Sequence, residues 1–75
     1  MKTDQLRGVV GAAPFQPFNI HVAEGRFVHV PHPDFILITG GGRRAIVSRP
    51  DDDWFTIIDL PLVTQLEVPA SGASA

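Results

Sequence analysis

Turn-forming residues divide the chain after residue 13 into runs that are too short for anything but β-strands. Proline, glycine and aspartate clusters stand at short intervals, and the longest apolar runs between them hold about five residues. No helix-length segment separates these runs, so parallel strands, which need crossovers of about a dozen residues, are excluded. The sequence therefore predicts a sheet of short antiparallel strands.

The first two predicted strands alternate apolar and polar residues around a tight turn. Residues 18–22 and 26–30 flank a three-residue loop that ends in Gly25, where glycine takes the left-handed conformation without a steric cost. This loop places Ile20 opposite Val28, so that the apolar residues of both strands share one face. The remaining predicted elements are strands over 35–39, 43–49 and 54–58, a 3₁₀ turn over 59–63, and a last strand over 64–68.

Residues 3–13 are predicted to form a helix in front of the sheet. Its apolar residues recur at helical spacing, and Pro14 ends it because the residue before a proline avoids the helical region. Gly8 and Gly11 lower its intrinsic stability, so the helix must dock on the sheet to persist. We expect one domain over residues 1–69, with the helix at 3–13, the sheet at 17–68 and a flexible tail at 70–75.

The order of these elements resembles the SH3-like small barrels, and among them the Sm-like arrangement. The matching parts are the helix at 3–13, the hairpin through Glu24-Gly25-Arg26, and the 3₁₀ turn and final strand within residues 56–68. The resemblance implies a mainly β fold, with an N-terminal helix and a five- to six-stranded, strongly bent antiparallel barrel. The segment from Pro14 to Phe35 is also similar to a group of short bacterial proteins without an assigned function.

Sm-like proteins that bind uridine-rich RNA use an Asp-x-x-x-Asn motif and an Arg-Gly or Lys-Gly pair. In this chain Asp34 matches the first position, but Ile38 stands in place of the Asn. The basic pair would fall near Ile58-Asp59, where neither a basic residue nor a glycine is present. The usual RNA-contacting residues are therefore missing, and a resemblance in fold does not by itself imply the function. The alternative function is RNA binding through atypical residues.

Charge and composition restrict the classes of partner and the cellular compartment that are expected for this protein. The net charge is −2 and the isoelectric point is about 5.8, which counts against nucleic acid as the main partner. The apolar runs fall far short of the roughly 20 residues of a membrane helix, and the first residues lack the apolar stretch of a secretory signal. No cysteine is present, so disulfides and thiolate zinc sites are excluded. We expect a cytoplasmic protein without membrane contact or cofactor.

Three histidines form the first candidate site. His21 and His29 fall on the outer face of the first hairpin, and His32 follows shortly after it. Three imidazoles can bind zinc, but histidines on a polar sheet face are more often simply solvated. We therefore expect no metal.

The glycine-rich turn at residues 40–42 is followed by two arginines. Its backbone N–H groups, with Arg43 and Arg44, are suited to an anion, but the spacing does not match a P-loop. In a strand the two arginines point to opposite faces, which weakens a joint grip on an anion. A flexible hairpin turn without a ligand is therefore the simpler interpretation. The candidate contacts for a ligand or nucleic acid are His29, His32, Arg43 and Arg44. The acidic turn at 51–53 is interpreted as a solvated chain reversal.

The predicted hairpin over residues 35–48 is apolar on both faces. A loop at the three glycines places Phe35 and Leu37 on the inner face. A small barrel has one interior, so the second face needs a cover, which the helix supplies in part and another copy of the chain supplies for the rest. The residues left on that second face are Ile36, Ile38 and Ile46.

The aromatic pair that opens the fifth strand extends this surface. Alternation predicts that one of Trp54 and Phe55 points inward and the other outward. No serine or threonine stands in a nucleophile motif, so no catalytic residue is assigned and no enzymatic activity is expected. The sequence predicts a small interaction or structural module that forms homo-oligomers. The predicted oligomer interface contains Ile36, Ile38, Ile46 and Trp54.

Overall fold

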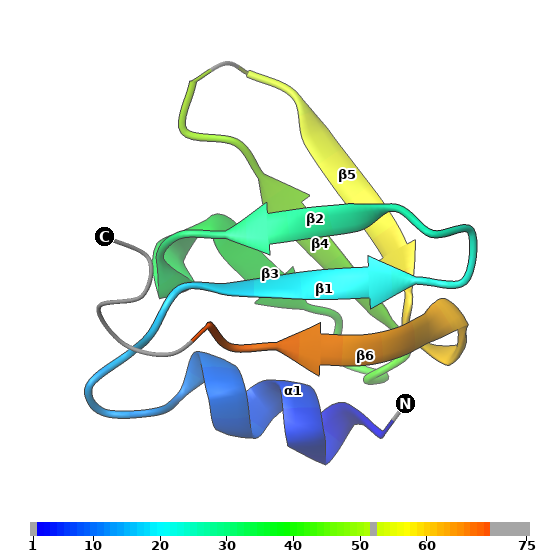
Figure 1. Ribbon diagram of the computed structural model, residues 1–75, viewed down its shortest axis with the longest axis horizontal. Helices are drawn as coiled ribbons and strands as arrows, with labels where there is room; N and C mark the ends of the chain where they lie inside the picture. The colour runs from blue at the N-terminus through cyan, green and yellow to red at the C-terminus, as the bar shows by residue number, and fades with distance from the viewer. Residues whose placement is uncertain (1, 52, 70–75) are drawn as a thin grey trace.

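A computed structural model describes residues 2–51 and 53–69 and has one short N-terminal helix followed by strands (Figure 1). The elements in chain order are α1 (Thr3–Val10), β1 (Phe18–Val22), β2 (Phe27–Val30), the 3₁₀ turn η1 (Pro33–Phe35), β3 (Ile36–Ile38), β4 (Arg44–Ser48), β5 (Phe55–Asp59), the 3₁₀ turn η2 (Leu60–Leu62) and β6 (Val63–Glu67). The mainly β prediction is confirmed. The tail predicted at 70–75 lies outside the described residues.

The strands form two small antiparallel sheets rather than a closed barrel. One sheet has the strand order β2-β1-β6 and the other has the order β3-β4-β5. The chain crosses from the first sheet to the second at η1 and returns at η2, both of which contain a proline that cannot donate to a ladder. The core lies between the sheets and contains Leu6, Phe18, Ile20, Val30, Ala45, Val47, Ile58, Leu60 and Val63.

The register predicted for the first hairpin is confirmed. Phe18 pairs with Val30 and Ile20 pairs with Val28 across β1 and β2. Gly25 in the turn has a φ of 86°, the left-handed conformation expected there. The inward-facing residues of this hairpin therefore reach the core, while the alternate residues face solvent.

The register predicted for the second hairpin is wrong by one residue. Ile36 pairs with Val47 and Ile38 pairs with Ala45. The loop contains one more residue than expected, because the Gly42 N–H closes a turn on the Thr39 carbonyl (2.8 Å) and residue 43 then joins the loop. A one-residue slip exchanges the two faces of a strand. Ile36 and Ile38 consequently pack against the core, and the outward position belongs to Leu37.

The helix is three residues shorter than predicted and is attached at both of its ends. Leu6 is completely buried, and Val9 and Val10 pack against the core. Thr3 does not cap the helix; its hydroxyl donates to the carbonyl of Gly42 in the β3–β4 turn. The helix therefore depends on contacts with the sheets, as its glycines suggested. No helix in the part of the chain that the structure describes is long and apolar enough to cross a membrane.

Candidate functional site

Large apolar side chains cover the outer face of the β3-β4-β5 sheet. Leu37 lies opposite Ile46 and Ile46 lies opposite Ile57, so the three form one line across the sheet, the apolar row. Leu37 and Ile57 are 62% and 58% exposed, and Ile46 is half-buried between them. Cross-strand neighbours are the units that stabilise a sheet, but a wholly apolar row facing water also offers a contact surface.

Both aromatic residues at the start of β5 lie at the surface. Trp54 is 68% exposed and Phe55 is 54% exposed, so the prediction that one of them points inward is wrong. Alternation holds only within a ladder, and Trp54 precedes β5, where its carbonyl accepts a bond from the Arg49 N–H (3.3 Å) at the end of the hairpin. Exposed aromatic residues of this size are frequent anchors of protein interfaces.

A groove of about 500 Å³ separates the free side of β2 from β5. Phe27 of β2, Ile57 of β5 and Leu62 of η2 line it and are each more than half exposed. Glu24 and Arg26, which form an ion pair at 3.0 Å, stand at its rim. We call this space the seam groove. It runs between the two sheets and continues from one end of the apolar row at Ile57.

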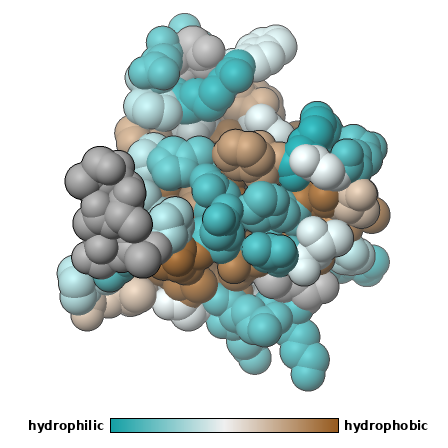
Figure 2. All heavy atoms as spheres, viewed as in Figure 1, coloured by the Kyte–Doolittle hydropathy of each residue, from teal (hydrophilic) through white to brown (hydrophobic). Residues whose placement is uncertain are grey.

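The outer face of the β2-β1-β6 sheet is polar instead. Figure 2 shows hydrophilic side chains over the centre of this face, where β1 and β2 lie. His29 Nδ1 lies 2.7 Å from Asn19 Oδ1, Asn19 Nδ2 donates to Glu67 Oε1 (3.2 Å), and His21 Nε2 lies 2.9 Å from the same oxygen. The hydrogen bonds from His21 and Asn19 lower the pKa of the Glu67 carboxyl. These contacts bind the side chains to one another across three strands.

His32 stands apart from the other two histidines. Its Nδ1 accepts the backbone N–H of Asp34 (3.1 Å) and so caps η1. Its ring lies between those of Phe15 and Phe35, with centroids 6.4 and 6.1 Å away. Within residues 2–51 and 53–69, no three histidine or acidic side chains come together as a metal site would require.

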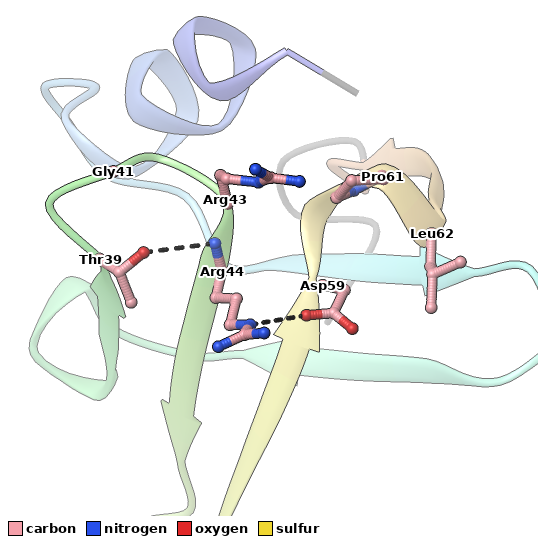
Figure 3. Close-up of a pocket in the computed structure, with 7 residues that line it drawn as sticks. All are labelled: Thr39, Gly41, Arg43, Arg44, Asp59, Pro61 and Leu62. Carbon is pink, nitrogen blue, oxygen red and sulfur yellow. Dashed lines mark hydrogen bonds and ion pairs between the residues drawn. The ribbon is translucent and has the colours of Figure 1, made fainter.

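The two arginines after the glycine turn line a common hollow of about 660 Å³. Figure 3 shows the Arg43 side chain extending towards Pro61 and the Arg44 side chain reaching Asp59. Arg43 belongs to the loop, so the strand alternation that predicted opposite faces does not apply to it. Its carbonyl accepts the Leu60 N–H (2.9 Å), which fixes it beside η2. Arg44 Nε donates to Asp59 Oδ1 at 3.0 Å, so its charge is already partly compensated.

Comparisons with known proteins add no assignment. No protein-family model matches the chain, and no curated protein or solved structure matches it.

The structure places the predicted site residues on several surfaces. Of the predicted interface, Ile46 and Trp54 face outward, whereas the other two isoleucines do not. Sequence reasoning missed Leu37 and Ile57, the two ends of the row. The longer loop places Leu37 opposite Ile46, and the β4–β5 pairing places Ile57 opposite Ile46 on the other side. Sequence reasoning also missed Phe27 and Leu62, whose common groove depends on how the sheets meet.

Proposed function

We propose that this protein is a small non-enzymatic interaction or structural module that associates with further copies of itself. The observation that carries the proposal is the apolar row of Leu37, Ile46 and Ile57 on the outer face of the β3-β4-β5 sheet. Contiguous apolar surface of this kind is uncommon on monomers and usually marks an interaction site. A chain of 75 residues has a thin core, and burying part of this surface in an oligomer adds stability that the core lacks.

The proposal includes an SH3-like or Sm-like arrangement of the strands. Support comes from the order of elements: an N-terminal helix, antiparallel strands in two facing sheets, and η2 directly before a strand that returns to β1. The first sheet gives way to the second at η1, which fits the strong bend that the resemblance implies.

Sedimentation equilibrium tests the self-association. At tens of micromolar protein we expect a mass that is a multiple of 8.1 kDa. The association should persist at 1 M salt, because apolar burial is not screened as surface charge is. A mass of one chain throughout the concentration range contradicts the proposal.

RNA binding is the second candidate, and the hollow beside η2 favours it. Arg43 and Arg44 both line this hollow next to the exposed glycine turn, an arrangement suited to phosphate oxygens. Fluorescence anisotropy with single-stranded uridine-rich RNA tests it. Binding that falls steeply with salt and is lost in Arg43→Gln, but retained in Arg26→Gln, supports an RNA site. Absence of binding at low salt removes this candidate.

A further inference from the structure

The two three-stranded sheets have four edge strands, and three of them are shielded from pairing. β3 spans only three residues. β6 runs beside α1, and residues of both line a common hollow (Figure 1). β2 is four residues long and is followed by Pro31. Short length, covering elements and prolines are the usual protections of an edge. β5 is less protected: it is five residues long, Phe55–Asp59, with four residues before its first charge, Pro61 lies beyond its end, and β2 faces it only across the seam groove.

The hydrogen bonds of β5 show which of its backbone groups do not bond to β4. The Leu60 N–H donates to the Arg43 carbonyl (2.9 Å), and the Arg49 N–H donates to the Trp54 carbonyl (3.3 Å). Hydrogen-bonded and non-hydrogen-bonded pairs alternate along an antiparallel ladder. The N–H and C=O groups at the positions between these pairs therefore point away from β4, towards the free side. These positions are Phe55, Ile57 and Asp59.

We propose that β5 pairs with β5 of a second copy, antiparallel and centred on Ile57. In this register Ile57 faces Ile57 of the second copy, and Phe55 faces Asp59. Each of the three positions whose N–H and C=O groups point away from β4 then faces another such position in the second copy. This gives about six backbone hydrogen bonds across the two-fold axis. The two sheets become one continuous sheet, and the apolar rows of the copies meet end to end. This inference rests on the proposed self-association and names its surface.

The side chains around β5 suit this occupant. Phe27, Phe55, Ile57 and Leu62 are each 54–58% exposed. Since an aromatic side chain can bury about 150–250 Å², the two phenylalanines alone leave on the order of 200 Å² uncovered, about a quarter of the ~800 Å² that each partner gives to a standard interface. The strand edge and the flanking residues supply the remainder.

Charge also permits the pairing. Asp59 is bonded to Arg44 of its own chain at 3.0 Å, and the register places it opposite a phenylalanine instead of another carboxylate. The net charge of −2 gives only weak repulsion between copies. An unprotected edge without opposing like charges is where strand pairing between molecules is expected.

Cysteine cross-linking tests the register directly. The chain has no cysteine, so Ile57→Cys adds a single thiol. In an antiparallel hydrogen-bonded pair the Cα atoms lie about 5.5 Å apart, within the range of about 4.4–6.8 Å that a disulfide spans. Under mild oxidation we expect this variant to form the covalent dimer at least about 10-fold faster than Leu37→Cys, an equally exposed control on the same face. Equal rates, or faster cross-linking at Leu37, overturn the inference in favour of face-to-face packing.

Two further variants separate the inference from the proposed function. Ile57→Pro removes an N–H that β4 does not use, and we expect it to raise the dimer dissociation constant at least about 10-fold. Ile57→Lys keeps the backbone and places two charges at the axis, with the same expectation if the proline variant does not fold. Leu37→Lys, at the β3 end of the apolar row and away from the β5 edge, is the control and should change the constant less than about 2-fold.

The association state measured by sedimentation equilibrium distinguishes failure of the proposed function from failure of this inference. A monomeric wild-type protein overturns both the proposed self-association and this inference. A dimer that Ile57→Pro and Ile57→Lys leave intact overturns the inference alone. A ring or larger assembly also overturns it, because a two-fold contact closes at two copies.

Discussion

Gly42 fixes the turn between β3 and β4 in a conformation that other residues rarely adopt. Its φ is 71°, and a Cβ at this position would lie 2.8 Å from the Thr3 hydroxyl oxygen. The same hydroxyl donates to the Gly42 carbonyl, so the turn and the start of α1 are joined. This glycine therefore determines both the loop length and the position of the helix.

The first prediction concerns that glycine. Gly42→Ala should lower the free energy of unfolding by about 1–3 kcal/mol, because it strains the backbone and displaces Thr3. Gly40→Ala is the matched control in the same turn; its Cβ would meet open space, and the change should stay within about 0.5 kcal/mol. Urea denaturation measures both. Equal midpoints for the two variants would show that the turn is not restricted at Gly42.

The second prediction concerns the carboxyl of Glu67. Its pKa in the folded protein lies below the ordinary value of 4.5, chiefly because His21 donates to it. We expect NMR titration to show this, and His21→Ala to raise the pKa towards 4.5, whereas His32→Ala should leave it unchanged. A Glu67 pKa that His21→Ala does not move refutes the assignment.

The sign of the accompanying pH dependence follows from that lowered pKa. The ionised carboxylate contributes stability above its unfolded pKa near 4.5, and this contribution is lost as the pH falls through the lower folded value. Glu67→Gln should therefore flatten the acid side of the curve of stability against pH. Urea midpoints measured from neutral pH to below 4.5 check it.

At the scale of elements, α1 is held by one fully buried side chain. Leu6 is the buried residue of this helix, and Gly8 lies two residues after it. A helix of eight residues is not stable alone in water, so its order depends on docking. The attachment at Leu6 therefore controls whether the helix stays on the sheets.

The third prediction follows from that attachment. Leu6→Ala should cost about 2–5 kcal/mol, which is the range for deleting a buried leucine side chain and leaving a cavity. Gln5→Ala, at an exposed neighbouring position, should change stability by less than about 0.5 kcal/mol. Chemical denaturation followed by circular dichroism measures both. A loss below about 1 kcal/mol in Leu6→Ala would mean that the helix contributes little to the fold.

The sequence predicted the elements better than their connections. Alternation of apolar residues was enough to locate the strands and the register about Gly25, because a wrong register would expose the core face. It failed at residues 40–43, because three successive glycines permit loops of different length and only the closure on Thr39 selects one. The error exchanged Ile36 and Ile38 for Leu37 on the candidate surface. The seam groove could not be predicted, since it depends on the packing of two sheets rather than on local pattern.

At the scale of the whole molecule, the proposed association would be linked to stability. If copies bind only in the folded state, association favours folding by mass action. A domain of 75 residues has a small unfolding enthalpy, so modest changes in free energy move its melting temperature by several degrees.

The fourth prediction uses that linkage. Between 5 and 500 μM protein (on the order of a 100-fold range), the melting temperature should rise by about 5 °C or more. Ile57→Lys should reduce the rise, while Leu37→Lys should retain it. Calorimetry or circular dichroism across the range measures the effect. Melting curves that superimpose at all concentrations contradict self-association.

α1 lies along β6 and covers its edge, which limits the number of copies that the proposed assembly contains. With the helix docked, the proposed pairing uses β5, the least protected strand edge within residues 2–51 and 53–69, and two copies complete the assembly. When the helix detaches, each molecule offers an edge on each of its sheets, and contacts between unlike edges can continue without closing. Weakening the helix should thus convert a discrete dimer into open-ended fibres. Light scattering and thioflavin fluorescence of Leu6→Ala, compared with Gln5→Ala, would detect that change, and equal signals would show that the helix does not limit polymerisation.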